Sequence, residues 1–214
     1  MSANTSANIG PGRPKDLAKR QAILEAAKRL FLSNGYASTS MDAVAAEAGV
    51  SKLTVYSHFN DKETLLTAAV MAKCEEQLPT LLYELTPDTP VKTLLLNIAR
   101  GFHQLINSDE SVNLHRLIIA LGSQDPKLSQ IFIEAGPERV LQGMEGLLGK
   151  INQMGALHID KPRNAAEHFF CMLKGGANFR LLYGYGAPLT GEAAEAHVQE
   201  VVDLFIRAYR PEPG

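Results

Sequence analysis

The stretch from Gly49 to Lys62, which reads GVSKLTVYSHFNDK, constrains the fold of this chain more than any other segment. Gly49 suits a tight turn, and the Ser51 hydroxyl can accept a hydrogen bond from a backbone N–H two or three residues later. Val55 and Phe59 are four residues apart, which places both on the inner face of a short helix. A turn with Gly between two short helices is typical of a helix-turn-helix, whose second helix enters the DNA major groove.

The rest of the chain also has a helical pattern. Apolar residues recur at intervals of three and four, and strand-like alternation is scarce, so we predict an all-α fold of about nine or ten helices. A fourth helix should begin after an Asn60 cap and end or kink at Pro79. The other expected helices span residues 17–34, 41–48, 52–58, 90–107, 110–121, 126–135, 137–154, 161–183 and 191–209.

Three regions are predicted. They are a flexible N-terminal arm (1–16), a three-helix DNA-binding domain (17–62) and a larger helical domain for ligand binding and dimerisation (63–214). Charge follows this division, although the net charge is only −2. Residues 1–73 carry nine Lys and Arg against six Asp and Glu, whereas the remainder carries twelve against seventeen. A basic head joined to an acidic body is compatible with DNA binding, because phosphates respond to local charge.

Composition excludes several other classes of protein. The chain has 214 residues, of which 45% are apolar, and this is enough to bury a substantial core. It has no run of 18 apolar residues and no apolar secretion signal, so we expect a cytoplasmic protein without a membrane partner. Cys74 and Cys171 are too few for a disulfide framework or a zinc cluster, and no metal or cofactor is expected.

The segment LFLSNGYASTSMDAVAAEAGVSKLTVYSHFNDKETLL resembles the DNA-binding domain of the TetR family of bacterial repressors. The matching features are the helix that ends at Gly35, the Ser and Thr residues before the second helix, the AEAGVS turn, and the T-x-Y-x-H-F-x-x-K-E pattern from Thr54 to Glu63. More loosely, residues 115–141 and 169–184 are similar to the regulatory domains of the AefR group. The resemblance implies a dimeric regulator that binds double-stranded DNA and a small-molecule effector.

Candidate DNA contacts come from both the residues and the resemblance. Thr39 and Ser40 can cap the second helix or hold a phosphate. Tyr56 by spacing alone fits a core position, but the resemblance implies that Tyr56, His58 and Lys62 reach phosphates. Arg13 lies in a GRPK sequence that is either a solvated tail or a minor-groove hook. The full predicted set is Arg13, Thr39, Ser40, Met41, Lys52, Leu53, Thr54, Tyr56, Ser57, His58 and Lys62.

Asp42 is an acidic residue within the predicted DNA-binding surface, where a basic or polar residue would be expected. It occupies a position where several relatives have a basic or polar residue, and a carboxylate near DNA is costly unless it accepts from a cytosine amine. Its role stays open at this point.

The last two helices are predicted to form a dimer interface, because repressors of this kind bind two-fold related half-sites. A core within one chain is the alternative for the same residues. The predicted interface set is Gly175, Gly176, Phe179, Tyr183, Val198, Val202, Phe205 and Ile206.

An effector pocket is implied by the resemblance and not by spacing. The candidates combine apolar bodies with a few polar groups on helices that flank the expected centre of the domain. They are Phe102, His103, Ile106, His115, Met144, Phe170, Met172, Asn178 and Arg180, and each could equally be plain core or surface.

The functional prediction is a ligand-responsive repressor that binds a palindromic operator as a dimer and leaves it when the effector binds. The alternative is a helical adaptor, or a transcriptional activator without a small-molecule inducer. An enzyme is not expected, because the chain has no H-E-x-x-H pair, no G-x-S-x-G elbow and no phosphate-binding glycine loop.

Overall fold

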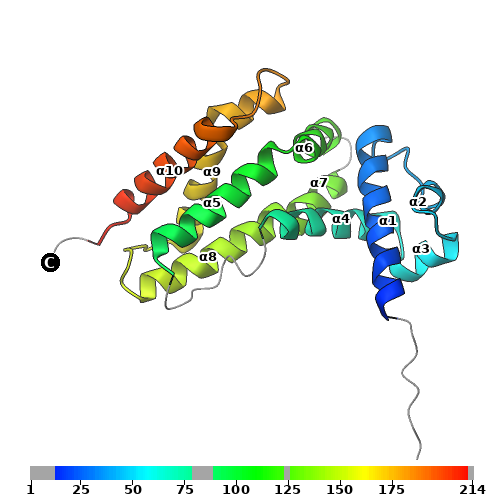
Figure 1. Cartoon of the computed structure of the whole chain (residues 1–214), viewed down its shortest axis with the longest axis horizontal. Helices are drawn as coiled ribbons and strands as arrows, with labels where there is room; N and C mark the ends of the chain where they lie inside the picture. Colours follow the sequence, from blue (N-terminus) through cyan, green and yellow to red (C-terminus); the bar gives the residue numbers. More distant parts are fainter. Residues whose placement is uncertain (1–12, 79–88, 123–125, 212–214) are drawn as a thin grey trace, which may run out of the picture. The chain divides into compact units, whose positions relative to one another are not determined.

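The computed structural model describes residues 13–78, 89–122 and 126–211, which form ten α-helices and no strand (Figure 1). The all-α prediction is therefore confirmed. The helices are α1 (Arg13–Asn34), α2 (Met41–Glu47), α3 (Lys52–His58), α4 (Lys62–Gln77), α5 (Val91–Asn107), α6 (Asp109–Gly122), α7 (Pro126–Ala135), α8 (Pro137–Gln153), α9 (Pro162–Leu182) and α10 (Gly191–Ala208).

The chain forms two compact units that divide between Ala69 and Val70, inside α4 rather than at its start. The first turns of α4 belong to the N-terminal unit because Leu65 and Leu66 are buried there with Ala69. Helix α4 is thus one continuous element with a half in each unit. The predicted arm overlaps α1, which begins at Arg13, and residues 1–12 lie outside the described part.

Two serine caps define the short helices of the N-terminal unit. The Ser40 hydroxyl accepts from the backbone N–H of Ala43 at 3.1 Å, and the Ser51 hydroxyl accepts from that of Thr54 at 3.1 Å. Between them Gly49 adopts a φ of +64°, a conformation that side chains with a Cβ disfavour. These contacts hold α2 and α3 in the helix-turn-helix arrangement.

Helix α4 begins differently from the prediction. Its first turn is capped by Asp61, whose carboxylate accepts from the Thr64 N–H at 2.7 Å, and not by Asn60. The two candidates are adjacent polar residues, and a one-residue shift decides which side chain reaches the free N–H groups.

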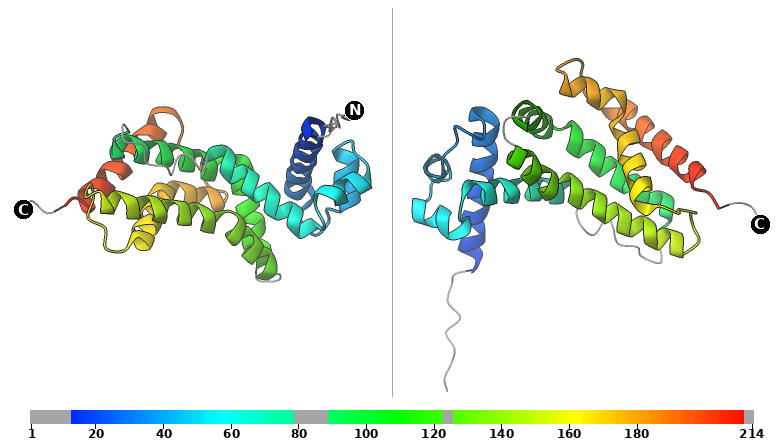
Figure 2. Two further views of the ribbon diagram at one scale, coloured as in Figure 1. Left: turned by 90° about the horizontal axis from the view of Figure 1, so that it is seen from below. Right: turned by 180° about the vertical axis from the view of Figure 1, so that it is seen from behind.

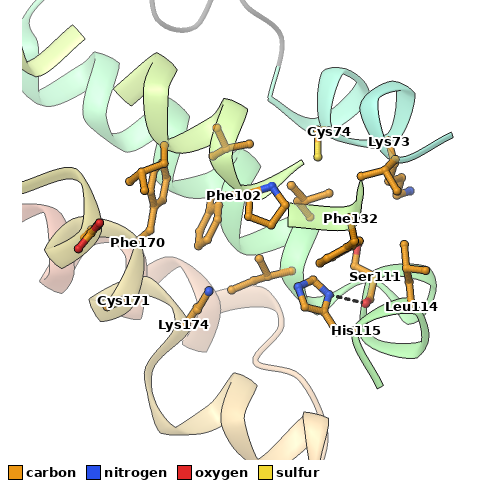
Figure 3. A pocket seen from close by; sticks show the side chains of 17 residues that line it. Lys73, Cys74, Phe102, Ser111, Leu114, His115, Phe132, Phe170, Cys171 and Lys174 are labelled. Atoms are coloured by element: carbon orange, nitrogen blue, oxygen red, sulfur yellow. Dashed lines mark hydrogen bonds between the residues drawn. The ribbon is translucent and has the colours of Figure 1, made fainter. Parts of the chain in front are cut away.

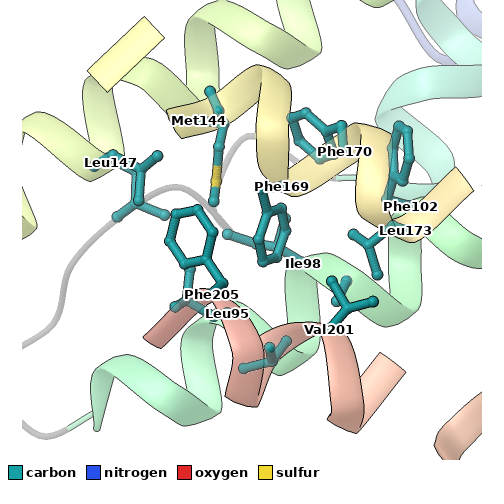
Figure 4. Close-up of a cluster of buried hydrophobic side chains, with 14 of the residues drawn as sticks. Leu95, Ile98, Phe102, Met144, Leu147, Phe169, Phe170, Leu173, Val201 and Phe205 are labelled. Atoms are coloured by element: carbon teal, nitrogen blue, oxygen red, sulfur yellow. The ribbon is translucent and has the colours of Figure 1, made fainter. Parts of the chain in front are cut away.

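The C-terminal unit has one large apolar core, to which α5, α8, α9 and α10 contribute (Figure 4). Helices α9 and α10 lie beside α5, as Figure 2 shows from two sides. At the centre, Phe169 contacts Phe205 and Phe170 edge to face, with ring centroids 5.1 and 5.6 Å apart. Phe169 and Phe205 are fully buried.

Helix α9 is kinked at Gly175, where φ is +52° and the backbone leaves helical geometry. The kink is stabilised from α10: His197 Nε2 donates to the Leu173 carbonyl at 3.0 Å. Beyond the kink, the buried Asn178 side chain donates to the Ile106 carbonyl at 3.0 Å and anchors the second half of α9 to the end of α5.

Candidate DNA-binding surface and ligand pocket

The outer face of α3 presents a mixed apolar, aromatic and basic surface. Val55 faces inward and is fully buried, while Leu53 is 83% exposed and Tyr56 is 41% exposed. Lys52 and Ser57 are also exposed, and the Lys52 ammonium lies 6.0 Å from the centre of the Tyr56 ring. Side chains of these types contact phosphates and base edges in DNA complexes.

Asp42 forms an ion pair with Lys52. The carboxylate oxygens of this α2 residue lie 2.8 and 2.9 Å from Lys52 Nζ, and both side chains are exposed. The hydrogen bond and charge of Asp42 raise the pKa of Lys52 above its ordinary value. The carboxylate that seemed misplaced in the sequence therefore holds the α3 lysine in position.

Thr39 and Met41 were predicted as DNA contacts, but the structure gives their side chains a structural role. Thr39 is buried, and its hydroxyl lies 2.8 Å from the Gly35 carbonyl and 3.1 Å from that of Leu30, where it ties the loop to the end of α1. Met41 is buried in the core of the unit. Ser40, between them, is exposed and makes the cap that the sequence had left open between Thr39 and Ser40.

His58 is also turned inward. Its side chain is 9% exposed and tilts against Phe59, and its Nε2 lies 3.1 Å from a carboxylate oxygen of Asp16. The geometry of this approach does not make a hydrogen bond, and Nε2 has no other hydrogen-bond partner among the described residues. The predicted phosphate contact of His58 is not available in this side-chain position.

Lys62 fastens the loop after α1 to the start of α4. Its ammonium donates to the carbonyls of Tyr36 and Ala37 at 2.8 and 3.3 Å and lies 4.3 Å from the centre of the Tyr36 ring. An ammonium has three N–H donors, so one remains for a phosphate. The side chain of Arg13 lies outside the described part of the structure, and its predicted contact stays a prediction.

A cavity of about 260 Å³ lies within the C-terminal unit (Figure 3). Most of its walls are apolar, and its aromatic side chains come from α5, α7 and α9: Phe102 and Phe170 lie 4.4 Å apart, and Phe132 meets the His115 ring edge to face at 5.0 Å. Apolar walls with a few polar groups are typical of pockets for small molecules.

Four of the predicted pocket residues line this cavity, namely Phe102, Ile106, His115 and Phe170. The other lining residues were not predicted from the sequence. They are Val70, Lys73, Cys74, Leu105, Ser111, Leu114, Phe132, Pro137, Val140, Leu141, Glu167, Cys171 and Lys174.

Helical spacing would have found many of these residues. On α9 the lining residues 167, 170, 171 and 174 form one stripe at intervals of three and four, and α5 contributes 102, 105 and 106 in the same way. Residues 111, 114 and 115 on α6 and 137, 140 and 141 on α8 repeat this pattern. Residues three and four positions away from a correct candidate on the same helix are therefore further candidates for the cavity wall.

Five predicted pocket residues do not line the cavity. Met144 lies in the central core and Met172 packs against it, because both are on other faces of their helices. Asn178 is committed to the α5 carbonyl described above, Arg180 is exposed, and His103 faces His197 with ring centroids 6.0 Å apart. Burial lowers the pKa of His103, and the neighbouring His197 lowers it further.

The predicted dimer residues divide into two groups. Val198, Val202 and Phe205 are buried in the core of their own chain, and Ile206 packs against that core, so the intrachain alternative is correct for them. Phe179 and Tyr183 are 60% and 75% exposed, and their rings lie 4.8 Å apart on the last turns of α9. Gly176 is exposed as well, whereas Gly175 makes the kink.

The described residues include neither a membrane-spanning helix nor a metal-binding cluster. No helix there is both long and apolar enough to span a membrane. No group of three or more His, Cys, Asp or Glu side chains in the same ranges is arranged to hold a metal ion.

Comparison with known proteins identifies both units. Residues 23–69 match the family model described as bacterial regulatory proteins of the TetR family, and residues 93–211 match the C-terminal domain of AefR-like transcriptional repressors. The uncharacterised helix-turn-helix regulator YdeS of Bacillus subtilis is 30% identical over 205 residues, which cover 93% of this chain and 92% of YdeS.

Solved structures give the same result. A TetR-family regulator from Mesorhizobium loti has a TM-score of 0.75 and 30% identity, and the match covers 93% of this chain and 100% of that one. The flavonoid-responsive regulator FrrA has a TM-score of 0.69 and 30% identity, with 91% and 98% of the two chains covered.

Proposed function

The chain is a TetR-family transcriptional regulator with a helix-turn-helix DNA-binding domain, and from this premise we propose that it is a dimeric repressor released from its operator by a small molecule. The observation that carries the proposal is the apolar cavity, since the second half of α4 contributes Val70, Lys73 and Cys74 to its wall. The first half of the same helix belongs to the DNA-binding unit.

The cavity offers a physical route from ligand to DNA. A ligand that favours one position of α4 changes the equilibrium between forms that fit the operator and forms that do not. A coupling of about 1–3 kcal/mol would weaken operator binding roughly 5- to 150-fold. Three phenylalanine rings on the wall favour an aromatic effector, and FrrA, which has 30% identity, is described as flavonoid-responsive.

For DNA contacts we propose the exposed α3 residues Lys52, Leu53, Tyr56 and Ser57, together with Thr54, Ser40, the remaining Lys62 donor and Arg13. Lys52 provides the cleanest test because its only ion pair among the described residues is with Asp42. If Lys52 contacts a phosphate, Lys52→Ala should weaken binding to all sequences and reduce the slope of log K against log salt by about one.

The experiment is fluorescence anisotropy at several salt concentrations, with an operator selected from random duplexes by the wild-type protein. Lys150→Ala is the matched control, because Lys150 is an exposed lysine of the C-terminal unit. An unchanged slope for Lys52→Ala would remove Lys52 from the interface. A wild-type protein that selects no sequence would contradict the repressor proposal and favour the adaptor alternative.

The effector step has its own test. Ligands are screened by thermal shift, and each one that binds is added to the protein–operator complex. Cys171→Tyr should narrow the cavity, because Cys171 lines it, and should abolish the ligand response while operator affinity is kept. Ligands that raise operator affinity would instead indicate an activator or a co-repressor mechanism.

For the dimer we propose an interface around the end of α9, where Phe179 and Tyr183 are exposed together. Exposed aromatic pairs of this kind mark interaction surfaces. Phe179→Glu should yield a monomer in size-exclusion chromatography with light scattering, whereas Ile133→Glu, at an exposed residue of α7, should leave a dimer. A wild-type monomer at micromolar concentration would refute the interface.

A further inference from the structure

Three charged side chains line the cavity, and only one of them has no ion-pair partner among the described residues. Lys73 Nζ lies 2.8 Å from a carboxylate oxygen of Glu110, and Glu167 is 3.4 Å from Arg163 Nε. Lys174 pairs with no carboxylate in the described part of the chain. Lys174, an exposed residue of α9, is therefore the one charged lining residue without a carboxylate partner in the described part of the chain.

His115 lies close enough to Lys174 to sense this charge, and its hydrogen bonding fixes its tautomer. Its Nδ1 is 2.7 Å from the Ser111 carbonyl oxygen, which can only accept, so Nδ1 carries the proton. In the neutral ring Nε2 is then an acceptor. Figure 3 shows this second nitrogen on the side of the ring away from the Ser111 bond, and Lys174 on the α9 wall of the same cavity.

We infer that the effector is a hydroxylated aromatic compound whose phenolic hydroxyl donates to His115 Nε2 and accepts from Lys174 Nζ. A hydroxyl is suited to this place because it can donate and accept at once. The apolar remainder of the ligand would lie against Phe102, Phe170 and Phe132. The inference rests on the proposed function of the cavity as the effector site and adds the chemical class of the effector.

A carboxylate fits the same place less well. It would satisfy Lys174 but would face the lone pair of His115 Nε2, unless the imidazole were protonated. Burial lowers the pKa of His115, and the charge of Lys174 lowers it further against the opposing effect of the Ser111 bond. The ring is therefore neutral at pH 7, and the pair selects hydroxyl over carboxylate.

The test compares three ligands that differ at one position, 4′-hydroxyflavone, 4′-methoxyflavone and 4′-carboxyflavone, by isothermal titration calorimetry at neutral pH. The methoxy compound keeps an acceptor but loses the donor, and the carboxylate adds charge. We expect the hydroxy compound to bind about tenfold more tightly than either of the others. One hydrogen bond to a buried acceptor accounts for an affinity difference of about this size.

Two variants test the two side chains separately. His115→Phe keeps a ring against Phe132 but has no acceptor, so the ratio between hydroxy and methoxy compounds should fall to about one. Lys174→Met removes the donor to an oxygen that both compounds carry, so it should weaken binding of both about threefold and leave their ratio unchanged. Lys150→Met, at an exposed lysine that does not line the cavity, is the control and should change neither affinity.

Equal or tighter binding of the methoxy or carboxy compound to the wild type, or no binding of any of the three, would overturn the assignment of ligand class. This wild-type comparison stands even if His115→Phe does not fold. Release of the operator by some other ligand would then keep the proposed function intact. Failure of the protein to bind any operator would overturn the proposed function instead, without bearing on the ligand ratios.

Discussion

In the N-terminal unit, α2 and α3 are seven residues long and each begins at a serine whose hydroxyl caps the helix. In the C-terminal unit, α5, α8, α9 and α10 span 17 to 21 residues, and none has a side-chain cap hydrogen bond. Short helices need caps because nucleation is costly, whereas long amphipathic helices gain their stability from packing. The two units should therefore respond to opposite kinds of substitution.

The largest effect is expected from a cavity in the C-terminal core. Phe169→Ala removes a fully buried ring that contacts Phe170 and Phe205, at a cost of about 3–5 kcal/mol. Hydrogen exchange followed by mass spectrometry should show faster exchange throughout α5, α8, α9 and α10, with α2 and α3 unchanged. Equal loss of protection in α2 and α3 would show that the units do not unfold separately.

A substitution in the Gly49 turn should instead destabilise the N-terminal unit. Gly49→Ala places a Cβ at a φ of +64° and should cost about 1–2 kcal/mol, although nothing lies within 4 Å of the added atom. Gly146→Ala on α8 is the control: its Cβ also meets nothing within 4 Å, but it has helical geometry and should be neutral or stabilising by about 0.5–1 kcal/mol. Urea denaturation of both variants measures the difference. A destabilising Gly146→Ala, or a Gly49→Ala without cost, would contradict the view that backbone conformation decides the outcome.

This difference also explains what the sequence could predict. The caps and the Gly49 turn are local, so the helix-turn-helix and most helix ends could be predicted within a few residues. The cavity depends on which faces of distant helices meet, so only four of nine candidates line it. The orientation of individual side chains was the least predictable feature. His58 turns inward, and Val198, Val202 and Phe205 are buried, because contacts far along the chain decide side-chain orientation. Thr39 turns inward toward carbonyls only four and nine residues away.

A third, smaller effect is the pH dependence of the C-terminal unit. The pKa values of His103 and His115 are lowered from 6.5, first by burial, so the folded unit binds protons less readily than the unfolded chain. Their contribution to stability is complete above pH 6.5 and is lost as the pH falls through their folded-state pKa values.

We expect the urea midpoint of the wild type to decrease between about pH 7.5 and about pH 5.5, and less so in His115→Phe. Circular dichroism follows both proteins. An identical decrease in the variant would mean that protonation of His115 does not contribute to the loss of stability.

The smallest effect concerns the ion pair on the DNA-binding surface. Asp42→Asn keeps the size of the side chain but removes a carboxylate next to the expected phosphates and leaves Lys52 free to pair with DNA, so operator affinity should rise about two- to fivefold. Anisotropy at low and high salt measures the change, with Glu192→Gln at an exposed residue of α10 as the control. Weaker binding by Asp42→Asn would have the opposite meaning: the carboxylate then orients Lys52 or accepts from a cytosine amine, and its charge is used in recognition and not merely tolerated.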